Sequence, residues 1–394
     1  MSIRQLKSGY FTVEGLNSFA TTFYFYYLYF FMQKTFGFDN KANLLLAALN
    51  GFIYMLAAWS GGKFGQRYGY FTALKCGFVM AIVSLACGLE AGSVAGHLVV
   101  MAFATIGACF TWPALEALVS EGETPAGIQR MVGIYNVTWA GTGALAYFSG
   151  GAMLDKWGLQ SLFFIPIAIQ LGQLGLVLWL EKQAHRAALP APVADPTSNP
   201  DEGLHRPPIA KARTFLRMAW LANPFAYIAI NTLVAVIPGV AKKLELSTML
   251  AGFYCSIWCF SRLAAFFALW FWTRWHYRFR WLLSAYLVLI AGFVTVALTP
   301  NLVLLVIAQL FFGAAIGLIY YSSLFYSMDV GETKGEHGGF HEAAIGFGNF
   351  AGPAVGATSL YFLPNVAHSG VLAVSGLLLL GFGALLAIWR KQKS

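Results

Sequence analysis

Five ionisable residues lie inside or at the ends of long apolar stretches: Glu14, Glu116, Arg262, His341 and Glu342. Placing such a group at the centre of a membrane helix costs roughly 2.5 to 3.5 kcal/mol, so each is a candidate for function. The sequence has no phosphate-binding Gly-Lys-Ser loop, no zinc-ligand pair at helical spacing, and no nucleophile with a nearby base and acid. These residues therefore indicate ion or ligand binding rather than catalysis, and we expect no enzyme activity, no cofactor and no bound metal.

Glu14 and Asn17 are three positions apart, so they share one face of the first apolar stretch. A carboxyl in this place is suited to proton binding or to contact with a ligand. It is equally compatible with an acid that lies near the inner water boundary and has no special role. The sequence leaves both interpretations open.

His341 and Glu342 are neighbours, and adjacent residues on a helix point about 100° apart. Both side chains therefore cannot face one cavity squarely. A histidine ordinarily titrates at about pH 6.5. Together with a glutamate in a span, it would be suited to proton binding. Both residues lie close to the predicted start of their helix, so a role as a gate or helix start is equally consistent with the sequence.

Arg262 lies in the middle of its apolar stretch, with no acid within helical reach. It needs a partner acid on another helix or an anionic ligand, unless its long side chain reaches the membrane surface. Glu116 follows Pro113 near the end of another stretch and could pair with Arg130. We interpret Glu116 and Arg130 as a structural or gating pair.

Polar amides and aromatic rings complete the set of candidates. A buried amide requires a hydrogen-bonding partner, which makes the asparagines within the spans candidates for binding: Asn50, Asn136, Asn231 and Asn349. The aromatic FYFYYLYFF segment could form a stacking wall for a flat ligand with other rings, although packing and interface belts are the commoner use. Those other rings are Trp112, Trp139, Trp258, Tyr320 and Tyr321.

The composition identifies the environment that must position these residues. The chain has 394 residues, of which 58% are hydrophobic and 10% charged, and its mean hydropathy is +0.65. Soluble domains contain about 25% charged residues. The apolar stretches are about 20 residues long, the length of a helix that crosses the bilayer. The sequence therefore predicts an all-α membrane protein.

Twelve spanning helices are predicted from stretches bounded by glycine, proline and charge. They are 8–32, 41–61, 72–93, 96–119, 131–153, 159–181, 220–241, 250–272, 280–298, 301–326, 338–362 and 369–389. A polar linker rich in proline and serine, 182–213, separates six spans in 1–181 from six in 214–394. The Gly-Glu-Thr sequences at 122–124 and 331–333 also indicate a duplicated unit, because each opens onto a glycine-rich apolar segment.

The distribution of basic residues predicts the orientation. With a cytoplasmic N-terminus, 19 lysines and arginines lie in inner segments and five in outer ones. This bias predicts that both termini are cytoplasmic. It also accounts for the net charge of +9, so no nucleic-acid partner is expected.

The segment after the second span contains Gly62, Arg67 and Gly69 at the spacing of the loop signature of the major facilitator superfamily. The chain resembles that family, although Gln66 replaces the usual aspartate and Tyr70 the usual basic residue. The resemblance implies two pseudo-symmetric six-helix bundles that expose a central site to each side of the membrane in turn. It also makes Gln66 and Arg67 gating candidates, with a weaker inner latch than a charged residue would give.

The resemblance implies a secondary active transporter of a small organic solute in the inner (plasma) membrane. We expect proton coupling through Glu14 or the His341–Glu342 pair, and a monomer in the lipid bilayer. A facilitative uniporter and a drug-type exporter remain alternatives, although Ala146-Tyr147 stands where exporters tend to carry Gly-Pro. A non-transporting membrane sensor or scaffold is the alternative of another class. The sequence determines neither the substrate nor the direction of transport.

Overall fold

The computed structural model describes residues 2–123, 125–186, 208–330 and 334–393, although not every side chain within them. The described residues form helices and turns, with no strand. The helices are α1 (Ile3–Phe36), α2 (Asn40–Tyr68), α3 (Tyr70–Glu90), α4 (Val94–Ser120), α5 (Pro125–Trp157), α6 (Ser161–Arg186), α7 (Ile209–Lys243), α8 (Thr248–Cys255), α9 (Ile257–Phe271), α10 (Phe279–Leu298), α11 (Leu302–Val330), α12 (Lys334–Phe362) and α13 (Ser369–Lys393).

Each predicted span coincides with a helix, and the eighth consists of α8 and α9 together. In the described residues, nine helical stretches are long and apolar enough to cross a membrane. The other three long helices are α1, α5 and α12. These three contain many of the polar candidates, which explains their lower apolar content. The predicted all-α membrane fold with twelve spanning helices in two bundles is confirmed.

The helices extend further into the polar stretch 182–213 than the sequence prediction placed them. Helix α6 continues to Arg186 and α7 begins at Ile209. The added turns are rich in alanine, lysine and arginine, which have high helix propensity. The charged side chains of lysine and arginine reach water where the helix ends extend beyond the hydrocarbon. Residues 187–207 lie outside the described part of the chain, as do Thr124 and 331–333 of the repeated tripeptides.

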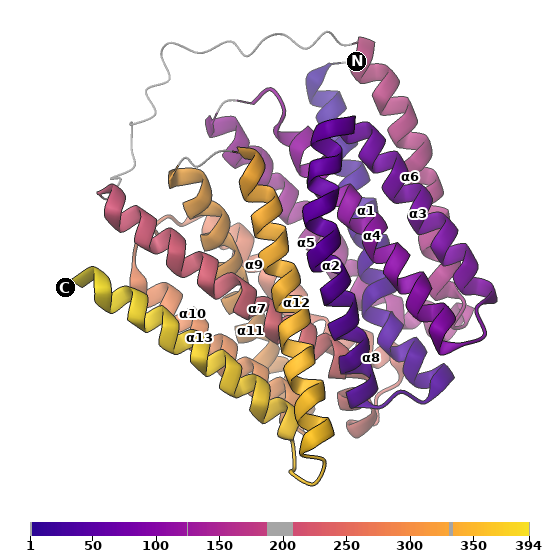
Figure 1. Cartoon of the computed structure of the whole chain (residues 1–394), viewed down its shortest axis with the longest axis vertical. Helices are drawn as coiled ribbons and strands as arrows, with labels where there is room; N and C mark the ends of the chain where they lie inside the picture. Colours follow the sequence, from indigo (N-terminus) through magenta and orange to yellow (C-terminus); the bar gives the residue numbers. More distant parts are fainter. Residues whose placement is uncertain (1, 124, 187–207, 331–333, 394) are drawn as a thin grey trace.

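Two halves, α1–α6 and α7–α13, lie next to each other (Figure 1). Their ribbons converge towards the end of the molecule that holds the turn between α12 and α13, and spread towards the end that holds the N-terminus. An even number of spans places both chain termini on one side of the membrane. We call that side the terminal face and the other side the opposite face.

Helices α2 and α12 make the most extensive contact between the halves and lie side by side in Figure 1. A Cβ atom built at Gly346 of α12 would lie 2.6 Å from the Cα of Met55 in α2. A Cβ at Gly51 of α2 would collide with the backbone of Asn349. Glycine permits this approach because it has no side chain, as at other close helix contacts in membranes. The two halves therefore meet backbone to backbone at this point.

The eighth span is interrupted at Ser256, between α8 and α9. The Ser256 hydroxyl donates a hydrogen bond to the carbonyl of Phe253 at 3.3 Å. Local bonds of this kind compete with the regular helical pattern. The interruption separates the part of the span at the opposite face from the part that carries Arg262.

Candidate functional site between the two halves

Glu14 is fully buried in α1, and neither carboxylate oxygen accepts a hydrogen bond from the described residues. The Tyr135 phenol of α5 lies beside it, close enough for electrostatic interaction but not in hydrogen-bond geometry. Glu116 of α4 and Glu342 of α12 are also within electrostatic range of Glu14. The structure therefore brings three predicted carboxyls from both halves into one region. None of them forms an ion pair with a described cation.

Neighbouring contacts hold Glu14 in place. The side-chain amide of Asn17 donates to the Thr111 hydroxyl of α4 at 3.0 Å. Gln173 of α6 donates to the backbone carbonyl of Val13 at 2.8 Å. Asn17 thus joins two helices, while its carbonyl oxygen is buried without a described partner.

Glu342 accepts a hydrogen bond from the Tyr54 hydroxyl of α2, so a carboxyl of one half is bonded to a phenol of the other. Helix α12 begins at Lys334, four residues before the predicted start. Glu342 is consequently about 12 Å from the start of the helix, so it does not have the alternative role of a helix-start residue. His341 lies in the same helix, but its side chain is outside the described part.

Glu116 and Arg130 do not form the predicted pair. Arg130 is exposed, and none of the ion pairs among the described residues joins it to Glu116. Glu116 instead lies within electrostatic range of Glu342. Pro113 lies one turn before Glu116 inside α4. Glu116 therefore belongs to the group of carboxyls rather than to a pair at the membrane surface.

Arg262 of α9 is 5% exposed and lies between two tryptophan rings, one from each half. Its guanidinium carbon is 4.5 Å from the ring centre of Trp139 in α5 and 5.0 Å from that of Trp258. The indole N–H of Trp139 donates to the Asn136 side-chain carbonyl at 2.8 Å, which fixes the ring. The described contact of the Asn136 side chain is therefore with Trp139. Tyr320 of α11 also packs against Trp139, so part of the expected aromatic wall is present.

The other three predicted amides connect helices within one half. Asn50 of α2 accepts a hydrogen bond from the Thr105 hydroxyl of α4 at 2.5 Å. Asn231 of α7 donates to the side-chain carbonyl of Asn349 in α12. These bonds satisfy amide groups that would otherwise be costly in hydrocarbon. Their geometry supports helix packing more directly than ligand binding.

Gln66 and Arg67 are exposed at the end of α2. The Arg67 guanidinium lies 5.3 Å from the ring centre of Tyr68. The contact expected from the loop signature is with the start of α12, where the side chains of 334–341 lie outside the described part. The weaker inner latch stays a prediction.

A latch at the opposite face was missed by sequence reasoning. Asp155 of α5 accepts a hydrogen bond from the backbone N–H of Met249 at 2.9 Å, at the start of α8 in the other half. Lys34 of α1 donates to the Thr248 hydroxyl at 2.5 Å and lies 3.6 Å from Asp155. We call Lys34, Asp155, Thr248 and Met249 the opposite-face latch. Its carboxylate is placed favourably, because the first N–H groups of a helix attract negative charge.

We expect Asp155→Ala to open the opposite face, because the variant loses both the helix-start contact and the ion pair. Nitroxide labels at Trp157→Cys and Glu245→Cys, with accessible Cys76 and Cys87 replaced, would measure the distance between the halves. The distance distribution should shift to longer values. Asp39→Ala is the matched control, since Asp39 caps α2 within one half. An unchanged distribution in Asp155→Ala would show that this contact does not hold the face closed.

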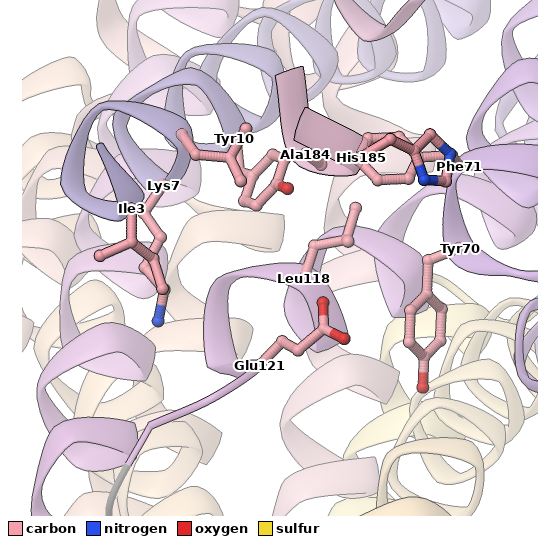
Figure 2. Close-up of a pocket in the computed structure, with 10 residues that line it drawn as sticks. Ile3, Lys7, Tyr10, Tyr70, Phe71, Leu118, Glu121, Ala184 and His185 are labelled. Carbon is pink, nitrogen blue, oxygen red and sulfur yellow. The ribbon is translucent and has the colours of Figure 1, made fainter. Parts of the chain in front are cut away.

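A separate cavity of about 260 Å³ lies within the first half, near the terminal face. Figure 2 shows Lys7 and His185 on opposite sides of this cavity, with Tyr10 and Leu118 between them. The other lining residues are Ile3, Leu6, Tyr70, Phe71, Glu121 and Ala184. None of the predicted site residues lines it, so the cavity is distinct from the site between the halves.

Comparison with known proteins agrees with this geometry. The profile of the Major Facilitator Superfamily matches residues 10–353. The chain belongs to this superfamily and is a transporter rather than an enzyme. A tetracenomycin C resistance and export protein of Streptomyces glaucescens is 28% identical over 143 residues, 35% of this chain. That match spans 26% of the relative's own length.

Three solved transporters share the fold. The nucleoside transporter NupG superimposes with a TM-score of 0.69 and 13% identity, over 98% of this chain and 99% of its own. The human organic anion transporter MFSD10 gives 0.65 and 16%, over 98% and 100%. A peptide transporter (POT) in complex with sulfate gives 0.71 and 16%, over 99% and 98%. At these identities the likeness concerns the fold alone, and it extends over nearly the whole chain.

Proposed function

We propose that the protein is a secondary active transporter that moves a small organic solute by alternating access and couples this movement to protons. The observation that carries the proposal is the group of Glu14, Glu116 and Glu342 between the two halves, without an ion pair to a described cation. Carboxyls placed in this way can be neutralised by protons. Because they lie on α1, α4 and α12, a change in their protonation would change the interaction between the two halves.

The fold supports alternating access because its contacts between halves are of two kinds. Backbone-close packing of α2 against α12 brings the halves together near the middle of the spans. Polar contacts, namely the Tyr54–Glu342 bond and the opposite-face latch, can break and re-form. We propose the halves 1–181 and 214–394 as the moving units, and the monomer as the working form. We also propose that the terminal face is cytoplasmic, in the inner (plasma) membrane, because of the bias in basic residues.

The test is solute flux in liposomes that contain the purified protein and carry an imposed pH gradient. We expect accumulation of at least one solute from a panel of nucleosides, peptides, organic anions and drugs, and loss of accumulation when a protonophore collapses the gradient. Flux down the solute gradient that does not depend on the pH gradient would indicate a facilitative uniporter. Absence of flux for the whole panel would favour a membrane sensor or scaffold and contradict the proposal.

Export is the second candidate for the direction of transport. Its support is the partial likeness to an export protein, 28% identical over 143 residues. Vesicles that are acidic outside and vesicles that are acidic inside distinguish the two directions. Symport accumulates solute when the outside is acidic, because protons and solute enter together, whereas antiport accumulates solute when the lumen is acidic, because protons leave as solute enters.

A further inference from the structure

Arg262 carries a positive charge inside the membrane region, and the described residues place no acidic partner beside it. It is 95% buried, its Nε makes no hydrogen bond, and none of the ion pairs among the described residues includes it. Arginine does not give up its proton in proteins. A buried charge is unfavourable unless it is paired. The described part of the protein therefore leaves the positive charge of Arg262 without a counter-charge.

The rings around Arg262 hold it without neutralising it. Trp139 and Trp258 contact the guanidinium through cation–π interactions, which stabilise a cation but carry no net charge. Since Trp139 is oriented by Asn136, the guanidinium is kept between rings of the two halves. An arginine held in this way is prepared to bind a planar anionic group with two parallel hydrogen bonds.

Phenol groups and flat rings surround the same place. Tyr227 of α7, Tyr320 of α11 and Tyr26 of α1 lie within electrostatic range of Arg262. Neutral phenols can donate hydrogen bonds to an anion. Phe266, one turn after Arg262, packs edge-on against Trp139 with ring centres 5.9 Å apart. A ligand here would meet aromatic surfaces as well as the guanidinium.

We propose that Arg262 binds the carboxylate of the transported solute, and that the substrates are small organic anions with a flat apolar body. The inference rests on the proposed function and names the substrate class for the same site. The proton-binding carboxyls and the anion-binding arginine lie on different helices. A monoanion and a proton would thus cross together as a neutral pair.

Binding to the purified full-length protein tests the proposal with three matched pairs of carboxylate and amide. The pairs are benzoate and benzamide, naphthoate and naphthamide, and indole acetate and indole acetamide. Tryptophan fluorescence and thermal unfolding report binding, since a ligand that binds only the folded state raises its apparent stability. We expect at least one carboxylate to bind about 10 to 100 times more tightly than its amide, the range for a hydrogen bond to a charged group.

Arg262→Gln should reduce that carboxylate to the affinity of its amide, while Arg262→Lys keeps part of the preference because it keeps the charge but loses the planar fork. Arg280→Gln is the matched control, because Arg280 is an exposed arginine 5.8 Å from a tryptophan ring, and its affinities should be unchanged. Size-exclusion chromatography checks that each variant is folded. If Arg262→Gln fails to fold, the proposal is tested by the affinity ratio of carboxylate to amide in the wild type and by its decrease in Arg262→Lys.

Equal affinity for carboxylate and amide in the wild type would overturn the proposal, and so would a preference that survives in Arg262→Gln. Chloride or phosphate should raise the apparent thermal stability less than the carboxylates do. An equal rise would also overturn the proposal and indicate a site for inorganic anions. Proton-driven flux of uncharged solutes without any preference for carboxylates would reject this inference and keep the proposed function. Carboxylate binding in a protein that transports nothing would reject the proposed function instead.

Discussion

Glu14→Gln is expected to abolish accumulation of solute driven by a pH gradient while leaving exchange of solute across the membrane intact. Glutamine has nearly the shape of a protonated glutamate but cannot gain or lose a proton. Glu14 is fully buried and its oxygens accept no hydrogen bond from the described residues, so the neutral amide should fit without breaking a contact. The variant should still change conformation, although it would no longer carry a proton.

Proteoliposomes measure both activities. A gradient of one pH unit supplies about 1.4 kcal/mol per proton, enough for about tenfold accumulation of a monoanion that crosses with one proton as a neutral pair. The wild type should approach this ratio, and Glu14→Gln should reach only passive equilibration. Exchange of labelled for unlabelled solute should continue in both. Glu90→Gln, a change at an exposed acid, is the control. If Glu14→Gln still accumulates solute, another group carries the proton.

Tyr54→Phe is expected to slow transport by about tenfold or more. The substitution removes the hydroxyl that donates to Glu342 and leaves the carboxyl without that partner. Loss of a hydrogen bond to a charged group costs about 1.5 to 3 kcal/mol, and each 1.4 kcal/mol corresponds to a factor of ten. Because this bond joins α2 of one half to α12 of the other, its loss should change the balance between conformations more than the stability of either half.

A double-mutant cycle with Glu342→Gln separates this pair from its surroundings. If Tyr54 acts through Glu342, the double variant should transport as slowly as the more impaired single variant, not more slowly. Initial rates of exchange provide the measurement. Tyr68→Phe at an exposed position is the control. Additive losses in the double variant would show that Tyr54 and Glu342 act independently.

The sequence predicted the fold well because bilayer thickness imposes a length on each helix, and every predicted span coincides with a helix. It also identified the charged side chains of the site, since a charge in an apolar stretch is conspicuous. It did not identify Tyr54 or Tyr135, because the chain contains 18 tyrosines and nothing in their spacing distinguishes these two.

Contacts between the halves were the least predictable part of the site. The choice of Tyr54 as the partner of Glu342 depends on how two helices separated by most of the chain are packed. Lys34 and Asp155 lie at helix ends. Charged residues are common there, so their presence in the sequence does not indicate a contact between the halves. Asn231 and Asn349 were recognised as polar residues in spans, but only the structure shows that they bond to each other.

The opposite-face latch should make the closure of that face sensitive to the ionic strength of the medium. The side chains of Lys34 and Asp155 are 43% and 35% exposed, so dissolved ions reach them. Exposed charges are screened over about 8 Å at physiological ionic strength and over about 3 Å in molar salt. Glu14 between the halves is fully buried, so it is shielded from that screening. A saltier medium should therefore loosen the closure of this face without weakening the interactions at the centre.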